Sequence, residues 1–133
     1  MATWIQAKEL LTKKYPAKVN EDLKELGFDN LEIEFKTTEN RTQSVIIQKI
    51  PFGVEWLQVL SGIGEIPPNK LEYSLERCLL LPFGGIVSLQ GLHFLRESLP
   101  LDDLTPERLI NVIETIVRFA DQLEKDFVGG DEN

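Results

Sequence analysis

The spacing of apolar residues changes from helical to alternating near residue 30, and that change constrains the fold more than any other feature. Before it, apolar residues recur at helical intervals. Over residues 31–36 the sequence Leu-Glu-Ile-Glu-Phe-Lys alternates apolar and charged side chains, which is typical of a strand with one buried and one solvated side. A helical start followed by alternating strands predicts an α+β domain.

Two helices are predicted before the alternation. Thr3 is a suitable N-cap for the first, and Pro16 ends or kinks it. Asn20 is a plausible cap for a second, shorter helix, and Gly27 is placed to stop it.

Five strands are predicted after these helices. Pro51-Phe52-Gly53 separates the second strand from the third, and Gln90-Gly91 is a two-residue turn between the last two. Short links between consecutive strands favour antiparallel pairing. The expected strands are 31–36, 44–50, 54–63, 86–89 and 92–99.

A third helix is expected after Asn69. Leu71, Leu75, Cys78 and Leu79 fall on one of its faces. We therefore expect this helix to lie on the sheet.

The strongest local signal begins the last helix, expected over residues 106–126. Thr105 is its predicted cap and Pro106 its first residue. Its apolar stripe consists of Leu109, Ile113, Ile116, Ala120, Leu123 and Phe127, widened by Ile110, Val112, Val117 and Phe119. Asn111, Glu114, Thr115, Arg118, Asp121, Gln122 and Lys125 are left for water. So broad a stripe fits core packing alone or core packing plus a protein interface. Beyond it, residues 128–133 are expected to be a frayed acidic tail.

The predicted order is α-β-β-β-α-β-β-α, with the two helices before residue 30 counted as one helical region with a break. The chain is expected to form a single domain spanning residues 1–133, with an antiparallel sheet of about five strands. A chain of 133 residues is long enough to bury a packed core without disulfides.

Composition excludes several classes of protein. The chain has 14 Lys and Arg against 22 Asp and Glu, a net charge of -8, so we expect no nucleic-acid partner. It has no apolar run of the roughly 20 residues that a bilayer crossing needs, so no membrane insertion is expected. The single cysteine predicts a reducing compartment and hence the cytoplasm. Residues 101–133 carry three bases and nine acids, which indicates a solvated face or a surface for a basic partner.

Catalytic and cofactor motifs are missing from the sequence. His93 and Cys78 are its only histidine and cysteine, so a multi-histidine metal site is excluded. We expect His93 on the outer face of the sheet, opposite Leu92 and Phe94, and Cys78 buried in its helix. Gly62-Ile63-Gly64 lacks the spacing of a phosphate-binding loop. An enzyme based on Cys78 and His93 is the least favoured hypothesis, and no cofactor is expected.

Three local patterns resemble a known family. They are Leu79-Leu80-Leu81-Pro82-Phe83-Gly84, the run Phe94 to Leu101, and the ending from Leu104-Thr105-Pro106-Glu107 to Phe119-Ala120-Asp121. With the order of elements, these resemble the type III secretion chaperone-like fold, in particular its YbjN-like group and a family of cyanobacterial and plastid proteins. The resemblance implies a homodimer that binds an extended stretch of a client protein without catalysis.

The leading hypothesis is a non-enzymatic protein-binding module, a chaperone or assembly factor acting as a homodimer. The third helix and its neighbouring strands are the expected dimer surface. The alternative is a regulatory domain that binds a small ligand in an apolar pocket near Trp4, Trp56 and Tyr73. The candidate interface residues are Trp56, Leu75, Ile110, Val117 and Phe119.

Overall fold

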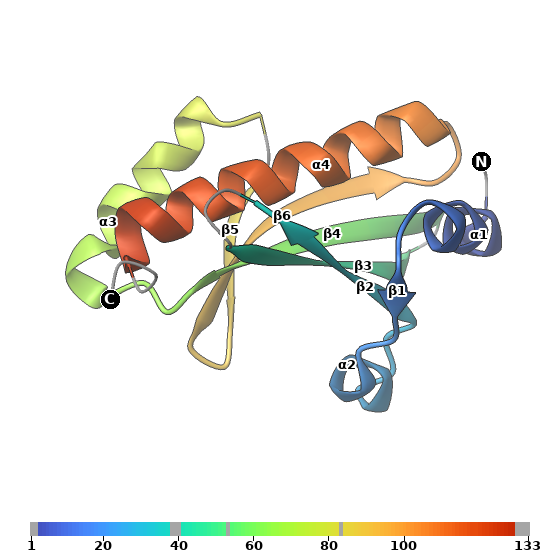
Figure 1. Cartoon of the computed structure of the whole chain (residues 1–133), viewed down its shortest axis with the longest axis horizontal. Coiled ribbons are helices and arrows are strands. Elements are labelled where there is room, and N and C mark those ends of the chain that lie inside the picture. The colour runs from blue at the N-terminus through green and yellow to red at the C-terminus, as the bar shows by residue number, and fades with distance from the viewer. Residues whose placement is uncertain (1–2, 38–40, 53, 83, 130–133) are drawn as a thin grey trace.

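The protein is an open six-stranded antiparallel sheet with helices packed at its ends and along one face (Figure 1). The computed structural model describes residues 3–37, 41–52, 54–82 and 84–129. Its strands, in the sheet order β1-β2-β3-β4-β6-β5, are β1 Ala17–Lys18, β2 Asn30–Lys36, β3 Thr42–Phe52, β4 Val54–Gly64, β6 Leu92–Pro100 and β5 Gly85–Leu89. The helices are α1 Trp4–Lys14, α2 Glu21–Glu25, α3 Pro68–Arg77, the 3-10 helix η1 Cys78–Leu80, α4 Pro106–Leu123 and the π-helical turn η2 Glu124–Val128.

The α+β class is confirmed, but the expected number of about five strands is too low by one. The additional strand is β1, which pairs antiparallel with β2 through Ala17 opposite Ile33 and Lys18 opposite Glu32. Two residues are too few to show an alternating pattern. This strand therefore depends on a contact with β2 that the sequence around Pro16 does not reveal.

The caps of the first two helices are confirmed. The Thr3 hydroxyl accepts a hydrogen bond from Gln6 N–H while the Gln6 side chain accepts one from Thr3 N–H, which is a capping box. The Asn20 side chain accepts from Leu23 N–H at the start of α2. Gly27 follows that helix with φ +95°, a conformation that glycine adopts without strain.

The strands β2, β3 and β4 form the expected antiparallel meander, and β4 then pairs with β6. Side chains of one parity along the strands point toward α4 and are buried, so this side is called the covered face. Its fully or nearly buried members are Leu31, Ile33, Val45, Ile47, Leu57, Val59, Ile63, Leu95 and Leu99. In Figure 1 α4 runs along this face, and α2 and the tip of the β5–β6 hairpin project on the opposite side.

The apolar stripe of α4 packs on the covered face as expected, and all six of its predicted core residues are buried. The expectation that Asp121 faces water is wrong. Asp121 is buried, and its Oδ1 lies 2.9 Å from Arg41 Nη2, which also lies 3.2 Å from Glu124 Oε1. The residue sits on the polar side of the helix by spacing alone, but Arg41 from the start of β3 closes over it. Val128, which was expected to begin a frayed tail, instead ends η2 and is half-buried, because its apolar side chain packs against the core. Residues 130–133 of the expected tail and the expected turn residue Gly53 lie outside the described residues.

The expectation that the third helix lies on the sheet is also wrong. It begins at Pro68, and among its residues Ser74 is buried while Leu75 is exposed. Figure 1 shows α3 at one end of the molecule, beside the C-terminal end of α4. Arg77 Nη1 lies 2.7 Å from Asp126 Oδ2, and its guanidinium lies 5.1 Å from the centre of the Phe127 ring. Because α4 already occupies the covered face, α3 docks on η2.

Candidate functional site

The face of the sheet opposite α4, here called the open face, carries the main hollow of functional interest. A groove of about 470 Å³ lies on it. The floor is formed by Ile46 and Gln48 of β3, Gln58 and Leu60 of β4, and Phe94 and Arg96 of β6. One wall contains Leu23, Leu26 and Phe28, in and just after α2, and the other contains Val87, Leu89 and Leu92 of the β5–β6 hairpin. We call this hollow the open-face groove.

Both walls are set by local sequence. At the hairpin, Gln90 has φ +52° and Gly91 has φ +83°, the paired positive values of the tight turn that suits twisted strands. On the other side, Asn20 N–H donates to Asn30 Oδ1 at 2.9 Å, and Asn20 Nδ2 donates to Glu32 Oε1 at 2.9 Å. These bonds tie the start of α2 to β2 and hold this wall of the groove in place.

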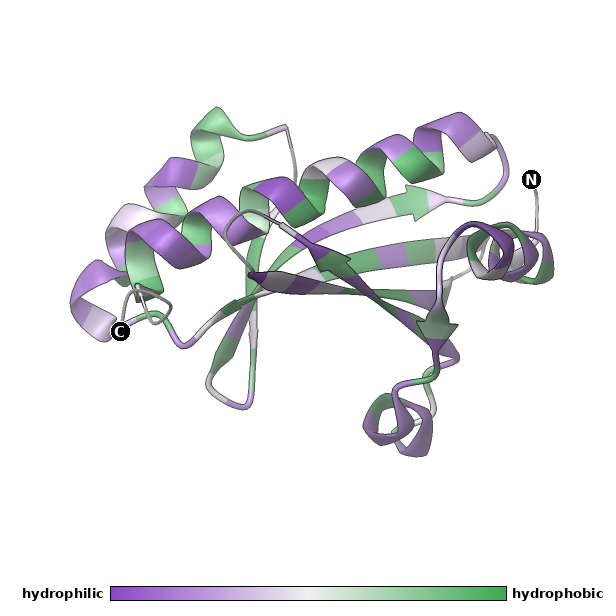
Figure 2. Ribbon diagram, viewed as in Figure 1, coloured by the Kyte–Doolittle hydropathy of each residue, from purple (hydrophilic) through white to green (hydrophobic). Residues whose placement is uncertain are grey.

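Large apolar side chains remain exposed on both walls. Leu26 is 64% exposed, and Leu89 and Leu92 are each 49% exposed. Figure 2 shows hydrophobic residues on the hairpin that projects from the sheet. Apolar surface of this kind, facing a hollow from two sides, gains free energy when another apolar surface covers it.

The centre of the floor is polar. Gln48 is only 5% exposed, and among the described residues its Oε1 has no hydrogen-bond partner. Gln58 lies directly opposite it across the β3–β4 pair, and Gln58 Oε1 accepts a long hydrogen bond of 3.5 Å from Arg96 Nη1. A buried acceptor without a partner costs roughly 1–3 kcal/mol, so a donor that reaches Gln48 recovers that free energy.

Arg96 is the positive charge of this floor. It is half-buried, and its neighbour on β5 is Gly85, which has no side chain to cover it. Within the part of the chain that the structure describes, no carboxylate lies within 4.0 Å of its guanidinium. Arg96 therefore contributes a positive charge to this side of the groove.

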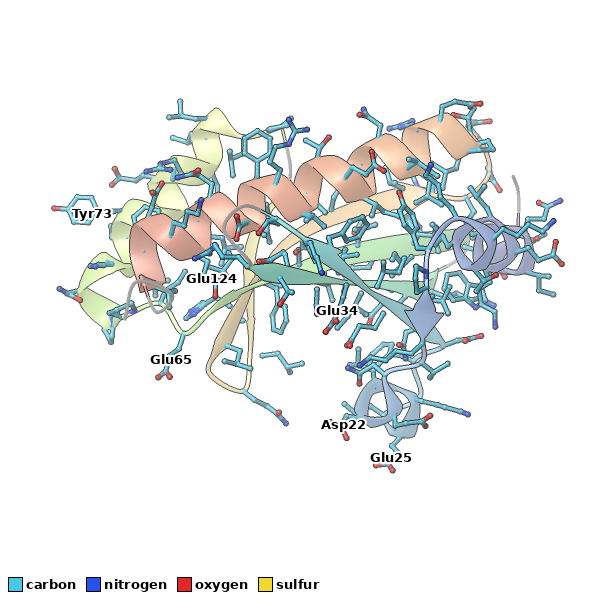
Figure 3. All side chains as sticks on the ribbon, viewed as in Figure 1. Asp22, Glu25, Glu34, Glu65, Tyr73 and Glu124 are labelled. Carbon is cyan, nitrogen blue, oxygen red and sulfur yellow. The ribbon has the colours of Figure 1, made fainter. Side chains whose placement is uncertain are left out.

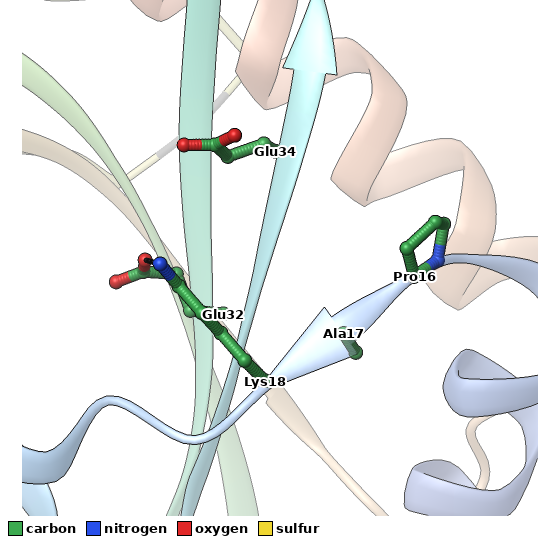
Figure 4. A pocket seen from close by; sticks show the side chains of 5 residues that line it. All are labelled: Pro16, Ala17, Lys18, Glu32 and Glu34. Carbon is green, nitrogen blue, oxygen red and sulfur yellow. Dashed lines mark ion pairs between the residues drawn. The ribbon is translucent and has the colours of Figure 1, made fainter.

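A second hollow of about 360 Å³ lies at the β1 edge of the sheet and is lined by Pro16, Ala17, Lys18, Glu32 and Glu34 (Figure 4). Lys18 Nζ lies 3.3 Å from Glu32 Oε2. The other Glu32 oxygen accepts from Asn20, so this carboxylate is occupied by contacts that hold β1 and α2. Glu34 is exposed. The polar groups that line this hollow therefore hold β1 and α2 against β2, and we assign the hollow no binding role.

The structure does not bring the five predicted interface residues together. Trp56 is half-buried on the open face, two residues along β4 from Gln58. Leu75 is exposed on α3, whereas Ile110 and Phe119 are half-buried on α4. Val117 is 4% exposed and belongs to the core. Val117 is therefore unsuited to an interface. The broad apolar stripe of α4 suggested an interface, but this part of the stripe packs on the sheet.

The predicted small-ligand pocket near Trp4, Trp56 and Tyr73 is not formed. Trp4 is in the core, and its Nε1 donates to Asp29 Oδ2 at 2.7 Å. Tyr73 is exposed on α3, at the opposite end of the molecule from α1 (Figure 3). These aromatic residues therefore lie in different parts of the molecule and do not line a common pocket.

Cys78 and His93 each have a separate structural partner. Burial raises the pKa of the Cys78 thiol, while a hydrogen bond from the backbone of Ile86 acts in the opposite direction. A raised pKa opposes thiolate formation. The Nδ1 atom of His93 accepts from Ile66 N–H at 3.1 Å. This histidine has the same strand parity as buried Leu95, so its expected place on the outer face is wrong, although it does lie opposite Leu92 and Phe94.

The open-face groove has no direct sign in the sequence, although the glutamines Gln48 and Gln58, each between apolar residues of the same face, were the available signal. No cluster of metal-ligating side chains occurs within the described ranges. None of the helices in those ranges combines the length and the apolar character that a membrane crossing requires.

Comparisons with protein-family models and with curated proteins found no match to this chain.

Proposed function

We propose that this protein is a non-enzymatic protein-binding module that holds an apolar segment of a partner protein in the open-face groove. One observation carries the proposal: exposed leucines line both walls of a groove whose sheet floor none of the described helices covers. Leu26 stands on one wall, and Leu89 and Leu92 on the other. A client chaperone or assembly factor is the corresponding biological role.

The shape of the groove favours a peptide chain. A small-molecule site usually encloses most of its ligand, whereas the leucines on the walls of this groove are about half exposed or more. A segment of a partner protein enters and leaves such a groove without being enclosed.

The chaperone-like fold, the homodimer and the cytoplasmic location are further parts of this proposal. Support for a dimer comes from an apolar patch on α3 and η1, which we call the terminal patch. It consists of Tyr73, Leu75, Leu79 and Leu80, of which Leu79 is 86% and Leu80 is 81% exposed. A second copy that covers this patch leaves the open-face groove accessible.

The test is selection of random peptides by phage display on the full chain. Enriched peptides are then synthesised and their affinities measured by fluorescence anisotropy on three proteins. The first is wild type, and the second is the wall variant Leu26→Asp with Leu92→Asp. The third is a matched control, Leu79→Asp with Leu80→Asp, which alters the terminal patch by the same chemistry. All four positions are exposed, so the variants are expected to fold.

We expect peptides with several large apolar side chains, and at least a roughly tenfold loss of affinity, or 1.4 kcal/mol, on the wall variant alone. No enrichment, or equal affinity for the wall variant and wild type, contradicts the proposal.

A small apolar ligand is the second candidate, because about 470 Å³ lies within the usual range for ligand pockets. Titration with dodecanoate and a panel of metabolites, followed by the fluorescence of Trp56 and Trp4 and by the melting temperature, separates the two functions. Saturable binding of one compound, together with a failed peptide selection, favours the small-ligand function.

A further inference from the structure

The floor of the open-face groove contains two polar groups that one occupant could bind at the same time, an acceptor and a positive charge. Gln48 Oε1 is a buried acceptor with no partner among the described residues, and its amide must rotate toward the groove before a donor there can reach it. Arg96 presents a guanidinium that no described carboxylate pairs. Both lie on the floor of a largely apolar groove. A charged group in such surroundings is strongly stabilised by an opposite charge that brings hydrogen bonds with it.

We infer that the partner segment carries an aspartate or glutamate side chain that pairs with Arg96, close to a backbone N–H that donates to Gln48 Oε1. This inference rests on the proposed function and specifies the chemistry of the partner. The groove is open, so the chain passes through it, and the carboxylate belongs to a side chain within the segment.

The strand register sets the separation of these two contacts. Gln48 lies opposite Gln58, and Arg96 lies opposite Leu60, which is two residues further along β4. Two strand spacings and two residues separate the backbones of Gln48 and Arg96 by roughly 12 Å. The Arg96 guanidinium leans toward Gln58, which shortens the span. An extended chain covers this span in about two to four residues.

Charge excludes a polyanionic occupant. The whole chain has a net charge of -8, and Asp22 stands on the wall of the groove. Lys18, at the β1 edge of the sheet, is already paired with Glu32. One guanidinium matches one carboxylate, with two parallel hydrogen bonds in the favourable geometry, whereas a nucleic acid or a polyphosphate needs several cations.

The first experiment uses a peptide library fused to the phage coat protein through its C-terminus, so that no free C-terminal carboxylate is presented. The strongest binder is synthesised with both ends blocked, and each acidic residue is replaced by its amide. We expect one replacement to lower the affinity for wild type roughly tenfold or more. The same replacement is expected to change affinity less than about twofold on Arg96→Met. Arg108→Met, on exposed α4 residue Arg108, is the matched loss of charge and should behave like wild type.

A swap of the two charges, one on the protein and one on the peptide, distinguishes loss of the ion pair from a general disruption of the groove. A peptide with lysine in place of the critical acid is expected to bind Arg96→Glu more tightly than it binds wild type. Circular dichroism and the melting temperature establish that both Arg96 variants are folded.

The second experiment addresses Gln48 by methylating each backbone nitrogen of the peptide in turn. We expect one methylation, two to four residues from the acid, to weaken binding to wild type about tenfold and to have little effect on Gln48→Leu.

The outcomes separate the inference from the proposed function. Peptides that bind in the groove without needing an acid, or whose acid is equally important on Arg96→Met, overturn the inference and leave the proposed function standing. A selection that yields no groove-dependent peptide overturns both.

Discussion

The two faces of the same sheet differ in what covers them, and the comparison separates stability from binding. On the covered face, side chains such as Ile47 and Leu57 are fully buried beneath α4. Their neighbours on the open face, Ile46 and Leu60, are only partly buried and share that face with Gln48. A sheet face that is exposed only to solvent would carry polar residues along its whole length. The mixture on the open face indicates a surface that stays exposed until a partner covers it.

The largest expected effect comes from removing apolar volume on each face in turn. Leu57→Ala is expected to lower the free energy of unfolding by roughly 2–5 kcal/mol, because it leaves a cavity under α4. Leu60→Ala removes the same atoms from a partly exposed position and should cost less than half as much. Urea denaturation measures both values. Equal losses would mean that the open face is as much a part of the core as the covered face.

The Arg41 ion pairs are expected to have the next largest effect, since they fix α4 over the covered face. Arg41 and Asp121 are both largely buried, so Arg41→Met leaves buried negative charge unpaired and should cost roughly 3 kcal/mol. Lys18→Met removes an exposed partner of Glu32 and should cost less than about 1 kcal/mol. Equal denaturant midpoints for the two variants would contradict the stabilising role of the Arg41 ion pairs.

Two glutamines provide a matched test of the faces. Gln43, on the covered side, is buried and donates to Ser61 Oγ at 2.9 Å and to the Gly62 carbonyl. Gln43→Leu is therefore expected to destabilise by roughly 1–3 kcal/mol. Gln48→Leu removes an acceptor that has no partner among the described residues and should raise the free energy of unfolding by about 1 kcal/mol, while it weakens peptide binding. Loss of stability in Gln48→Leu would show that this side chain already has a partner.

The smallest effect is confined to alkaline pH. The Tyr15 hydroxyl donates to Glu114 Oε2 at 2.7 Å, and burial, this hydrogen bond and the Glu114 charge raise the pKa of Tyr15 above its usual 10.0. The unfolded chain then releases this proton at lower pH than the folded chain does. The stabilisation is thus complete below about pH 10 and is lost as pH rises further. Melting temperatures between pH 8 and 11.5 should fall more steeply for wild type than for Tyr15→Phe, and parallel curves would contradict the role of this hydrogen bond.

Local patterns predicted the elements whose signals lie within a few residues. The caps at Thr3, Asn20 and Thr105 are formed as expected, because each depends on a side chain bonding to a backbone N–H three residues later. The hairpin turn at Gln90-Gly91 depends equally on local backbone conformation.

Features that depend on distant contacts were not predicted. The burial of Asp121 requires Arg41, 80 residues away, and the displacement of α3 from the sheet follows from the space that α4 occupies. For the site, Trp56 was the one candidate that lies on the open face. The groove itself combines residues from α2 to β6, and no single segment contains its pattern.

Binding in the open-face groove can be observed by methyl NMR of the isotopically labelled protein titrated with a peptide from the selection. If the partner segment binds there, the methyl signals of Ile46 and Leu60 on the open face shift, while those of Ile47 and Leu57 on the covered face stay unchanged. Shifts confined to Leu79 and Leu80 of the terminal patch would contradict this binding site, because the partner would then bind at the end of the molecule and leave the open-face groove empty.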